Sequence, residues 1–152
     1  MKLAEALQER TFVNRKLDEL RSRLMTNVLV QEGEKPAEDP KELLKEYDAC
    51  IQRLEHLIAS INLTNTKTIV KGKSLTELIA RKDALMVKLN AYKDIVYQAG
   101  RTSDRARNSE IRILSTVSVK DIQKKIDKLS EEIRLLDNTL QETNWTSDLI
   151  EE

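Results

Sequence analysis

The sequence VKDIQKKIDKLSEEIRLLDNTL, residues 119–140, decides the fold. Its apolar residues recur at alternating steps of three and four, the a/d spacing of a helix that packs along one seam. The seam consists of Val119, Ile122, Ile126, Leu129, Ile133, Leu136 and Leu140. Ser118 followed by Asp121 resembles a capping box, so the helix is predicted to begin near Val119 and to run to about residue 143.

Three further apolar stripes predict three more helices, near residues 2–29, 41–65 and 75–98. The first stripe is Leu3, Ala6, Val13, Leu17, Leu20 and Leu24, interrupted by Arg10 and Asn27. The second is Leu43, Tyr47, Cys50, Leu54, Leu57 and Ile61, flanked by Leu44, Ile51 and Ile58. The third is Leu75, Leu78, Leu85, Leu89, Tyr92 and Val96, with Ile79 and Met86 beside it. The wide apolar face of the second helix predicts neighbours on two sides.

Local signals place the helix ends. Pro40 suits a first helical position, and Ser74 with Glu77 forms a second capping-box pattern. Gly100 is predicted to end the third helix in the left-handed conformation, which glycine adopts without strain. The residues 111–117 are rich in β-branched side chains in partial alternation and are expected to form a short extended segment.

These patterns predict an all-α fold, with four long antiparallel helices forming an elongated bundle with coiled-coil-like packing. The chain of 152 residues has the size of one domain, and we expect residues 1–152 to form a single helical bundle domain. It contains three Gly, two Pro and 34% charged residues, which favours long solvated helices over a sheet.

Composition also excludes several classes of protein. No run of about 18 uncharged apolar residues is present, which argues against a transmembrane helix. The start of the chain lacks the apolar core of a signal peptide, so a cytoplasmic protein is predicted. The single Cys50 cannot form an internal disulfide, and neither a metal nor a cofactor is expected.

The net charge of zero gives no general attraction to nucleic acid or to a membrane, and neither is predicted as a partner. The charges are nevertheless segregated. The first connection, residues 31–39, is acidic, whereas the connection of residues 101–112 is rich in arginine. In an up-down-up-down bundle these two connections share one end. At the other end, a lysine-rich connection meets the acidic residues of the tail, and mutual neutralisation is expected at each end.

A search for catalytic residues gives mostly negative results, and the protein is interpreted as non-enzymatic. His56 is the only histidine and is expected at the surface or in an interface. A di-iron bundle needs a Glu-x-x-His motif from each of two helices, whereas the residue three before His56 is Arg53. Cys50 and His56 fall on different faces of their helix, which excludes a nucleophile pair.

The arginine-rich connection is the best candidate for a ligand site, because guanidinium groups recognise phosphate or carboxylate bidentately. The candidate residues are Arg101, Arg105, Arg107, Asn108, Glu110 and Arg112. Asn62, Asn65 and Trp145 are candidates for secondary polar or stacking contacts. The two asparagines are nevertheless interpreted mainly as residues that end their helix. Burial over the end of the bundle is the main reading of Trp145.

Four short segments, in this order along the chain, resemble the landmarks of a family of small bacterial helical proteins of uncharacterised function sometimes labelled septicolysin-like. They are Gln31-Glu32-Gly33-Glu34, Ile61-Asn62-Leu63-Thr64-Asn65, Ser109-Glu110-Ile111 and Asn144-Trp145-Thr146. The resemblance implies a uniform helical fold, self-association and an unknown activity. The label implies a cytolysin, but the chain shows no secretion signal, and the bundle seams account for its amphipathic segments.

Together these features predict a cytoplasmic helical assembly or interaction protein of unknown biochemical role that forms a homo-oligomer. Arg10 and Asn27 are candidates for setting the register of an interface between helices, or for lying at the solvent edge of the seam. The alternative is a ligand-binding module, or a hydrolase, acting on a small anionic, phosphate-containing molecule through the arginine-rich connection.

Overall fold

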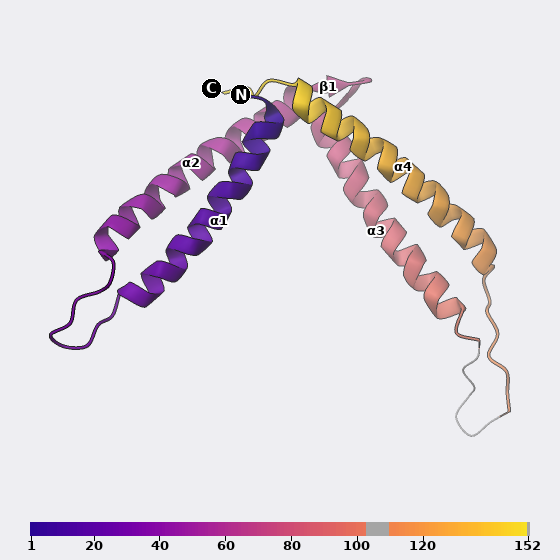
Figure 1. The fold of residues 1–152 in the computed structure, drawn as a ribbon. Helices are drawn as coiled ribbons and strands as arrows, with labels where there is room; N and C mark the ends of the chain where they lie inside the picture. The colour runs from indigo at the N-terminus through magenta and orange to yellow at the C-terminus, as the bar shows by residue number, and fades with distance from the viewer. Residues whose placement is uncertain (103–109, 152) are drawn as a thin grey trace. The chain divides into compact units, whose positions relative to one another are not determined.

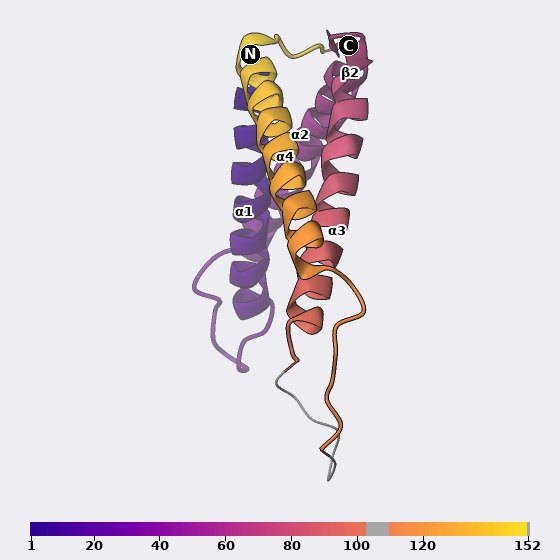
Figure 2. The same ribbon diagram turned by 90° about the vertical axis from the view of Figure 1, so that its right-hand side faces the viewer.

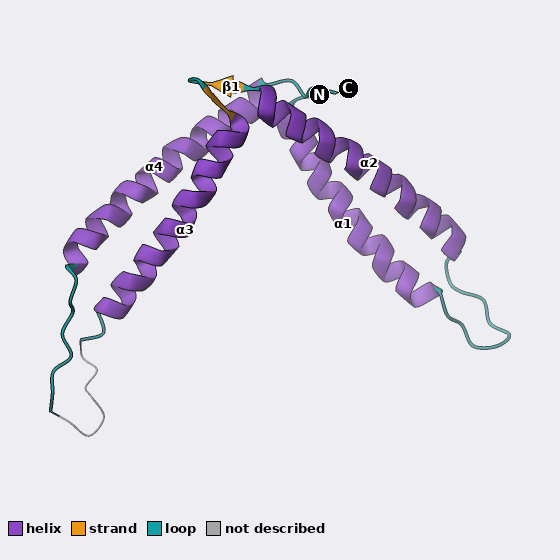
Figure 3. Cartoon of the chain, turned by 180° about the vertical axis from the view of Figure 1, so that it is seen from behind, coloured by secondary structure: helices purple, strands orange, loops and turns teal. Residues whose placement is uncertain are grey.

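The computed structural model describes residues 1–102 and 110–151 and confirms an all-α fold of four helices (Figure 1). These are α1 (Leu3–Asn27), α2 (Pro40–Lys67), α3 (Leu75–Ala99) and α4 (Val119–Thr146). Two very short strands, β1 (Ile69–Val70) and β2 (Lys73–Ser74), lie between α2 and α3 (Figure 3). Each helix begins and ends within three residues of its predicted bounds.

The chain divides into two compact units, which are described separately. The first unit comprises Met1–Ser74 and Thr143–Glu152, and the second comprises Leu75–Glu142. A single domain over residues 1–152 stays a prediction.

In the first unit, α1 and α2 pack side by side along the predicted seam (Figure 1). Leu20, Leu24 and Leu43 form a buried cluster, against which Tyr47 and Cys50 pack. All six apolar seam residues predicted for α1 are buried. The hydrophobic effect of closing this seam is the main reason that two helices this long pair.

The connection between α1 and α2 is fixed at both ends by side-chain hydrogen bonds. The Asp39 carboxylate accepts from the backbone N–H of Lys41 at 3.0 Å, so Pro40 begins the helix as predicted. The buried Asn27 accepts from the backbone N–H of Glu38 at 2.9 Å and donates to the carbonyl oxygen of Arg23 at 2.8 Å. Asn27 therefore orders a connection of its own chain, and the prediction that it lies at a solvent edge is wrong.

In the second unit, α3 and α4 run side by side (Figure 2). Leu89, Ile126, Leu129 and Ile133 form their buried cluster, with Leu85, Tyr92, Val96 and Ile122 packed around it. The Ser118 hydroxyl accepts from the backbone N–H of Asp121 at 3.3 Å, which confirms the predicted cap of α4. Gly100 follows the last residue of α3 as predicted, but its φ is not positive, so the left-handed end proposed for it is wrong.

The turn between β1 and β2 was not predicted from the sequence. Ile69 pairs with Ser74 and Val70 with Lys73 in antiparallel register. The two residues between them, Lys71 and Gly72, both have positive φ, at 50° and 84°. This is the backbone of a two-residue hairpin turn, which usually carries Asn or Asp where this chain has Lys71.

The segment predicted to be extended, residues 111–117, lies in the connection between α3 and α4. Within residues 111–117 the structure contains an isolated bridge at Arg112 and no strand. Ile111 and Leu114 point largely into solvent, with 69% and 75% of their surface exposed. The β-branched composition of the segment was therefore not sufficient to form a regular strand.

The last residues of the chain complete the first unit. Lys2 and Asp148 form an isolated antiparallel bridge, and the Lys2 ammonium lies 2.7 Å from the Asp148 carboxylate. The backbone N–H of Leu149 donates to the Met1 carbonyl at 2.9 Å. The backbone N–H of Ile150 donates at 2.8 Å to the hydroxyl of Thr64, a fully buried residue of α2.

The two helix pairs have helices of the same lengths, with their seam residues at the same positions. Helices α1 and α3 both have 25 residues, and α2 and α4 both have 28. The seam positions Leu3, Ala6, Val13, Leu17, Leu20 and Leu24 of α1 correspond in order to Leu75, Leu78, Leu85, Leu89, Tyr92 and Val96 of α3. Those of α2, namely Leu43, Tyr47, Cys50, Leu54, Leu57 and Ile61, correspond to Ile122, Ile126, Leu129, Ile133, Leu136 and Leu140 of α4. In both comparisons every position agrees when counted from the first residue of the helix.

The flanking bridges follow the same plan. Lys2 directly precedes α1 as Ser74 directly precedes α3, and Asp148 is the second residue after α4 as Ile69 is the second after α2. The structure pairs Lys2 with Asp148 and Ser74 with Ile69. The chain thus consists of two successive versions of one helical hairpin, and each helical residue has an equivalent in the other version.

Equivalent positions also carry ion pairs of opposite polarity. Glu9 of α1 accepts two hydrogen bonds from Arg53 of α2, both at 2.7 Å. The equivalent residues are Arg81 of α3 and Glu132 of α4, which also form an ion pair. Arg53 holds the pKa of Glu9 below its ordinary value of 4.5, chiefly through these hydrogen bonds. The acidic residue of the pair can therefore lie on either helix of the hairpin, because each pair crosses the same gap between the two helices.

Reversing both charges of the first pair should therefore be tolerated. Either single change, Glu9→Arg or Arg53→Glu, places like charges together and should lower the free energy of unfolding by about 0.5–1 kcal/mol. The double variant should recover most of that loss, since it reproduces the Arg81–Glu132 arrangement. Urea denaturation of the four proteins in a double-mutant cycle measures the coupling. If the double variant loses as much free energy of unfolding as the two single variants lose together, the two ion-pair sites are not equivalent.

Candidate interaction surface

The predicted arginine-rich site is only partly described by the structure. Arg105, Arg107 and Asn108 lie outside the described residues. The remaining predicted members, Arg101, Glu110 and Arg112, are exposed. Arg101 lines a hollow of about 370 Å³, whose walls include Ile95 of α3 and Ile113, Leu114 and Val117 from the following connection. Neither Glu110 nor Arg112 lines it, so the described part of this site brings one arginine beside a mainly apolar surface.

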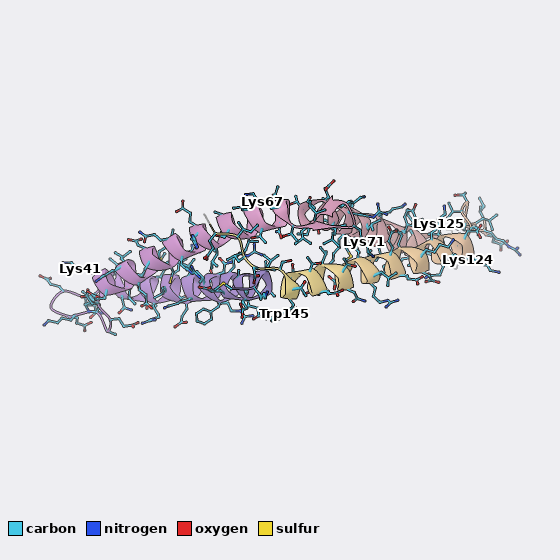
Figure 4. All side chains as sticks on the ribbon, turned by 90° about the horizontal axis from the view of Figure 1, so that it is seen from above. Lys41, Lys67, Lys71, Lys124, Lys125 and Trp145 are labelled. Atoms are coloured by element: carbon cyan, nitrogen blue, oxygen red, sulfur yellow. The ribbon has the colours of Figure 1, made fainter. Side chains whose placement is uncertain are left out.

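The secondary candidates lie apart from that hollow. Asn62 is exposed on α2 and lines a second hollow of about 550 Å³ together with His56 and Thr66. Asn65 is half-buried one turn further along α2. Trp145 has 52% of its surface exposed at the end of α4 (Figure 4), so the expectation of a buried indole is wrong.

His56 lies at the surface, as predicted. Its Nε2 is 3.2 Å from a carboxylate oxygen of Glu151, and both side chains are largely exposed. Since Glu151 belongs to the tail, this contact is one of several that hold the tail against the rest of the first unit. The imidazole therefore has a structural partner in the tail.

The acidic segments of the first unit are paired with basic residues of the same unit. Arg23, in the last part of α1, donates to Glu38 of the first connection and holds the pKa of that carboxyl below its ordinary value of 4.5. The hydrogen bond from Lys2 likewise lowers the pKa of Asp148. Within residues 1–102 and 110–151, no ion pair joins the tail to the lysine-rich connection, whose Lys67 and Lys71 are labelled in Figure 4. The predicted pairing of tail and lysines is therefore replaced by pairing with Lys2 and His56.

One apolar surface of α2 is not used in packing against α1. Leu44, Ile51 and Ile58 repeat every seven residues along one side of α2, with Asp48 and Glu55 between them, and we call these three residues the outer stripe. These side chains keep 50%, 40% and 42% of their surface exposed. Helix α1 covers the neighbouring seam, which begins at Leu43, but leaves the outer stripe in solvent. Of the two sides on which α2 was predicted to have neighbours, only one is occupied within the first unit.

The second hairpin shows that this stripe is not needed to build a hairpin. The residues of α4 equivalent to Leu44, Ile51 and Ile58 are Gln123, Ser130 and Asp137. Asp137 forms an ion pair with Lys82 of α3. A helix with a polar line at these positions therefore still packs against its neighbour, although α3 and α4 approach each other less closely than α1 and α2 do. The apolar character of the outer stripe requires an explanation outside the hairpin.

The same comparison shows how the surroundings of Arg10 differ from those of its equivalent in the second hairpin. Its equivalent is Lys82, and the residue equivalent to Asp137, the partner of Lys82, is Ile58. The first hairpin therefore keeps the cation but has an apolar residue in place of the carboxylate. Comparison of the two halves of the sequence would have revealed this difference, and the search for motifs within single helices missed it.

No helix within residues 1–102 and 110–151 combines the length and the apolar character needed to cross a membrane.

Comparisons with known proteins give a family without an assigned role. A family model described as a family of unknown function (DUF6847) matches residues 10–149. The solved structure of a functionally unknown conserved protein from Corynebacterium diphtheriae is similar, with 37% sequence identity, a TM-score of 0.92 and coverage of 99% of each chain. No curated protein matches the chain. Neither description mentions septicolysin, so that resemblance stays a prediction.

Proposed function

This chain belongs to the family of unknown function DUF6847, and we propose that it is a non-enzymatic helical assembly protein that forms a homo-oligomer through the outer stripe of α2. The observation that carries the proposal is the contrast between the two hairpins. Three positions are apolar and exposed in α2, whereas the equivalent positions of α4 are polar. Burial of exposed apolar surface is the main favourable term in protein association.

The size of the stripe fits an interface made from a helix face. Leu44 and Ile58 are separated by fourteen residues, which is roughly 21 Å along a helix. Further apolar contact is available beside Leu44, where a hollow of about 530 Å³ is lined by residues including Ala49. A second copy of the chain is the proposed partner, since most soluble oligomers are homo-oligomers with closed symmetry.

Placing a charge in the stripe should dissociate the assembly. We expect the unmodified protein to have at least a dimer's mass at micromolar concentration, and Ile51→Lys to have the mass of a monomer with its helix content unchanged. Size-exclusion chromatography with light scattering measures the mass, and circular dichroism measures the helix content. The matched control is Ser130→Lys, which puts the same charge at the equivalent position of α4 and should leave the oligomer intact.

Two results would contradict the proposal. The first is a monomeric mass for the unmodified protein. The second is loss of helix content in Ile51→Lys, because that would show that the stripe belongs to the core of the chain's own fold.

The alternative function, binding of a small phosphate-containing ligand, keeps one supporting observation, namely the position of Arg101 at the rim of an apolar hollow. A ligand bound to the native state raises the melting temperature in a saturable way. The assembly proposal predicts no saturable response to inorganic phosphate or nucleotides in a thermal-shift screen. A saturable response that is lost in Arg101→Ala would favour the alternative.

A further inference from the structure

We propose that a cluster of side chains joining α1, α2 and the tail is a pH-sensitive latch, which holds the tail more tightly when His56 is protonated. The cluster consists of Glu9 of α1, Arg53 and His56 of α2, and Glu151 of the tail, and we call it the tail latch. Histidine is the side chain that typically gains a proton between about pH 5 and 8, and His56 is the only histidine in the chain. The inference concerns the tail and is independent of the proposed self-association.

The tail latch holds more carboxylates than cations when the imidazole is neutral. Arg53 donates two hydrogen bonds to Glu9, both at 2.7 Å, so its guanidinium is bound to α1. Glu151 has its contact with His56 Nε2, at 3.2 Å. Among the residues that the structure describes, no lysine or arginine lies at ion-pair distance from Glu151. Protonation of His56 therefore supplies a second cation, and each carboxylate then has a cation of its own.

The charged groups around His56 come from all three segments. On α1, the pKa of Glu9 is lowered chiefly by its hydrogen bonds with Arg53, and the charge of a protonated His56 lowers it further. The pKa of Arg53 is raised chiefly by the hydrogen bond to Glu9, and the charge of Glu151 in the tail also raises it. On α2, only Arg53 is charged among the residues three and four positions from His56, which are Gln52, Arg53, Ala59 and Ser60. Two carboxylates and one guanidinium leave one negative charge, which an imidazolium cancels.

The second hairpin shows why the tail needs such a contact. The residue of α4 equivalent to His56 is Leu135, and Gly72 takes the place of Glu151 when both are counted from the end of the preceding helix. In that hairpin a two-residue turn joins Ile69 and Ser74 covalently. The equivalent bridge of the first unit joins the two ends of the chain. Of the two equivalent places, the imidazole and its carboxylate occupy the one where no turn closes the bridge.

The tail latch acts directly on the contact that covers Thr64. Ile150, next to Glu151, donates its backbone N–H to the Thr64 hydroxyl at 2.8 Å. His56 also lines the hollow of about 550 Å³ that continues along α2 to Thr66. Opening of the tail uncovers the Thr64 hydroxyl on α2. The pH therefore sets how often this part of α2 is accessible.

Hydrogen exchange at the Ile150 amide of the full chain measures how often the tail opens. After correction for the intrinsic exchange rate, we expect protection about two- to fourfold greater at about pH 5.5 than at about pH 7, the effect of one exposed ion pair. The comparison stops there because α-amino groups lose their proton above about pH 7. The pKa of Asp148 is lowered chiefly by Lys2 and also by the charge of the Met1 amine, so that amine acts on the tail too. The amide of Leu129, in the second unit, is the internal control and should not show this ratio.

Three variants assign the effect to the tail latch. His56→Gln keeps a hydrogen-bonding side chain without a titratable group, and Glu151→Gln keeps the imidazole without its carboxylate. Both should give equal protection of Ile150 at the two pH values. Asp148→Asn weakens the tail through a different pair, so it should lower the protection at both pH values and keep the ratio.

Three results would overturn the inference. The first is equal protection at the two pH values in the unmodified protein. The second is an unchanged ratio in His56→Gln or in Glu151→Gln. The third is a ratio that Asp148→Asn abolishes, because that would assign the pH dependence to the bridge between the chain ends.

Discussion

Replacing Leu129 with Ala should lower the free energy of unfolding by about 2–5 kcal/mol, the range for a large buried side chain that leaves a cavity. Leu129 lies at the centre of the cluster between α3 and α4 and has 7% of its surface exposed. Its neighbours Ile126 and Ile133 belong to the same helix and cannot move toward the gap without moving the helix. Urea denaturation followed by circular dichroism measures the loss.

The matched control is Leu135→Ala in the same helix. Leu135 has 52% of its surface exposed, so its removal costs little burial, while the change in helix propensity is the same. We expect a change within about 0.5 kcal/mol for this variant. Equal losses from Leu129→Ala and Leu135→Ala would show that the cluster of α3 and α4 does not carry the stability of the second unit.

Replacing Thr64 with Val should lower the free energy of unfolding by about 1–3 kcal/mol, because the change keeps the shape of the side chain and removes one buried hydroxyl. That hydroxyl donates to the Ser60 carbonyl at 2.7 Å and accepts from the backbone N–H of Ile150 at 2.8 Å. Without it the Ile150 N–H loses its partner, and the tail should dissociate more often. Denaturation measures the stability, and hydrogen exchange at the Ile150 amide measures the opening of the tail.

Two variants isolate the effect of the tail. Thr64→Ser keeps the hydroxyl and should keep the slow exchange of Ile150. Thr66→Val removes a hydroxyl that donates at 2.9 Å to the carbonyl oxygen of Asn62, four residues earlier, as the Thr64 hydroxyl donates to Ser60. The Thr66 hydroxyl is exposed, however, and does not bind the tail. Fast exchange at Ile150 in Thr66→Val, or unchanged exchange in Thr64→Val, would contradict the role assigned to Thr64.

The helices and their buried faces could be predicted from the sequence because they depend on local spacing. Leu3, Leu17 and Leu20 are buried as their positions on the first stripe require. Pro40 and Ser118 mark helix starts through chemistry that acts within one turn. The hairpin turn at Lys71 was missed because the first residue of such a turn is usually Asn or Asp, and Gly72 alone is a weak signal.

Contacts between distant parts of the chain could not be predicted in the same way. The bond from Ile150 to Thr64 joins residues that no periodic pattern relates. Trp145 was expected to be buried over the end of the bundle, yet 52% of its surface is exposed where its helix ends. The outer stripe was visible in the sequence as a wide apolar face. Only the comparison with α4, which has polar residues at the same positions, shows that the hairpin does not require it.

The two bridges that flank the helices have the same geometry but very different distances along the chain. Ile69 and Ser74 are joined by a two-residue turn, and a hairpin of this kind forms in about 1–10 μs. Lys2 and Asp148 must instead meet from opposite ends of the sequence, which adds the entropic cost of closing a long loop. The first pairing therefore needs only neighbouring residues, whereas the second needs residues from either side of both hairpins to come together. The same small structural element thus joins residues across a two-residue turn in one place and closes a loop that contains both hairpins in the other.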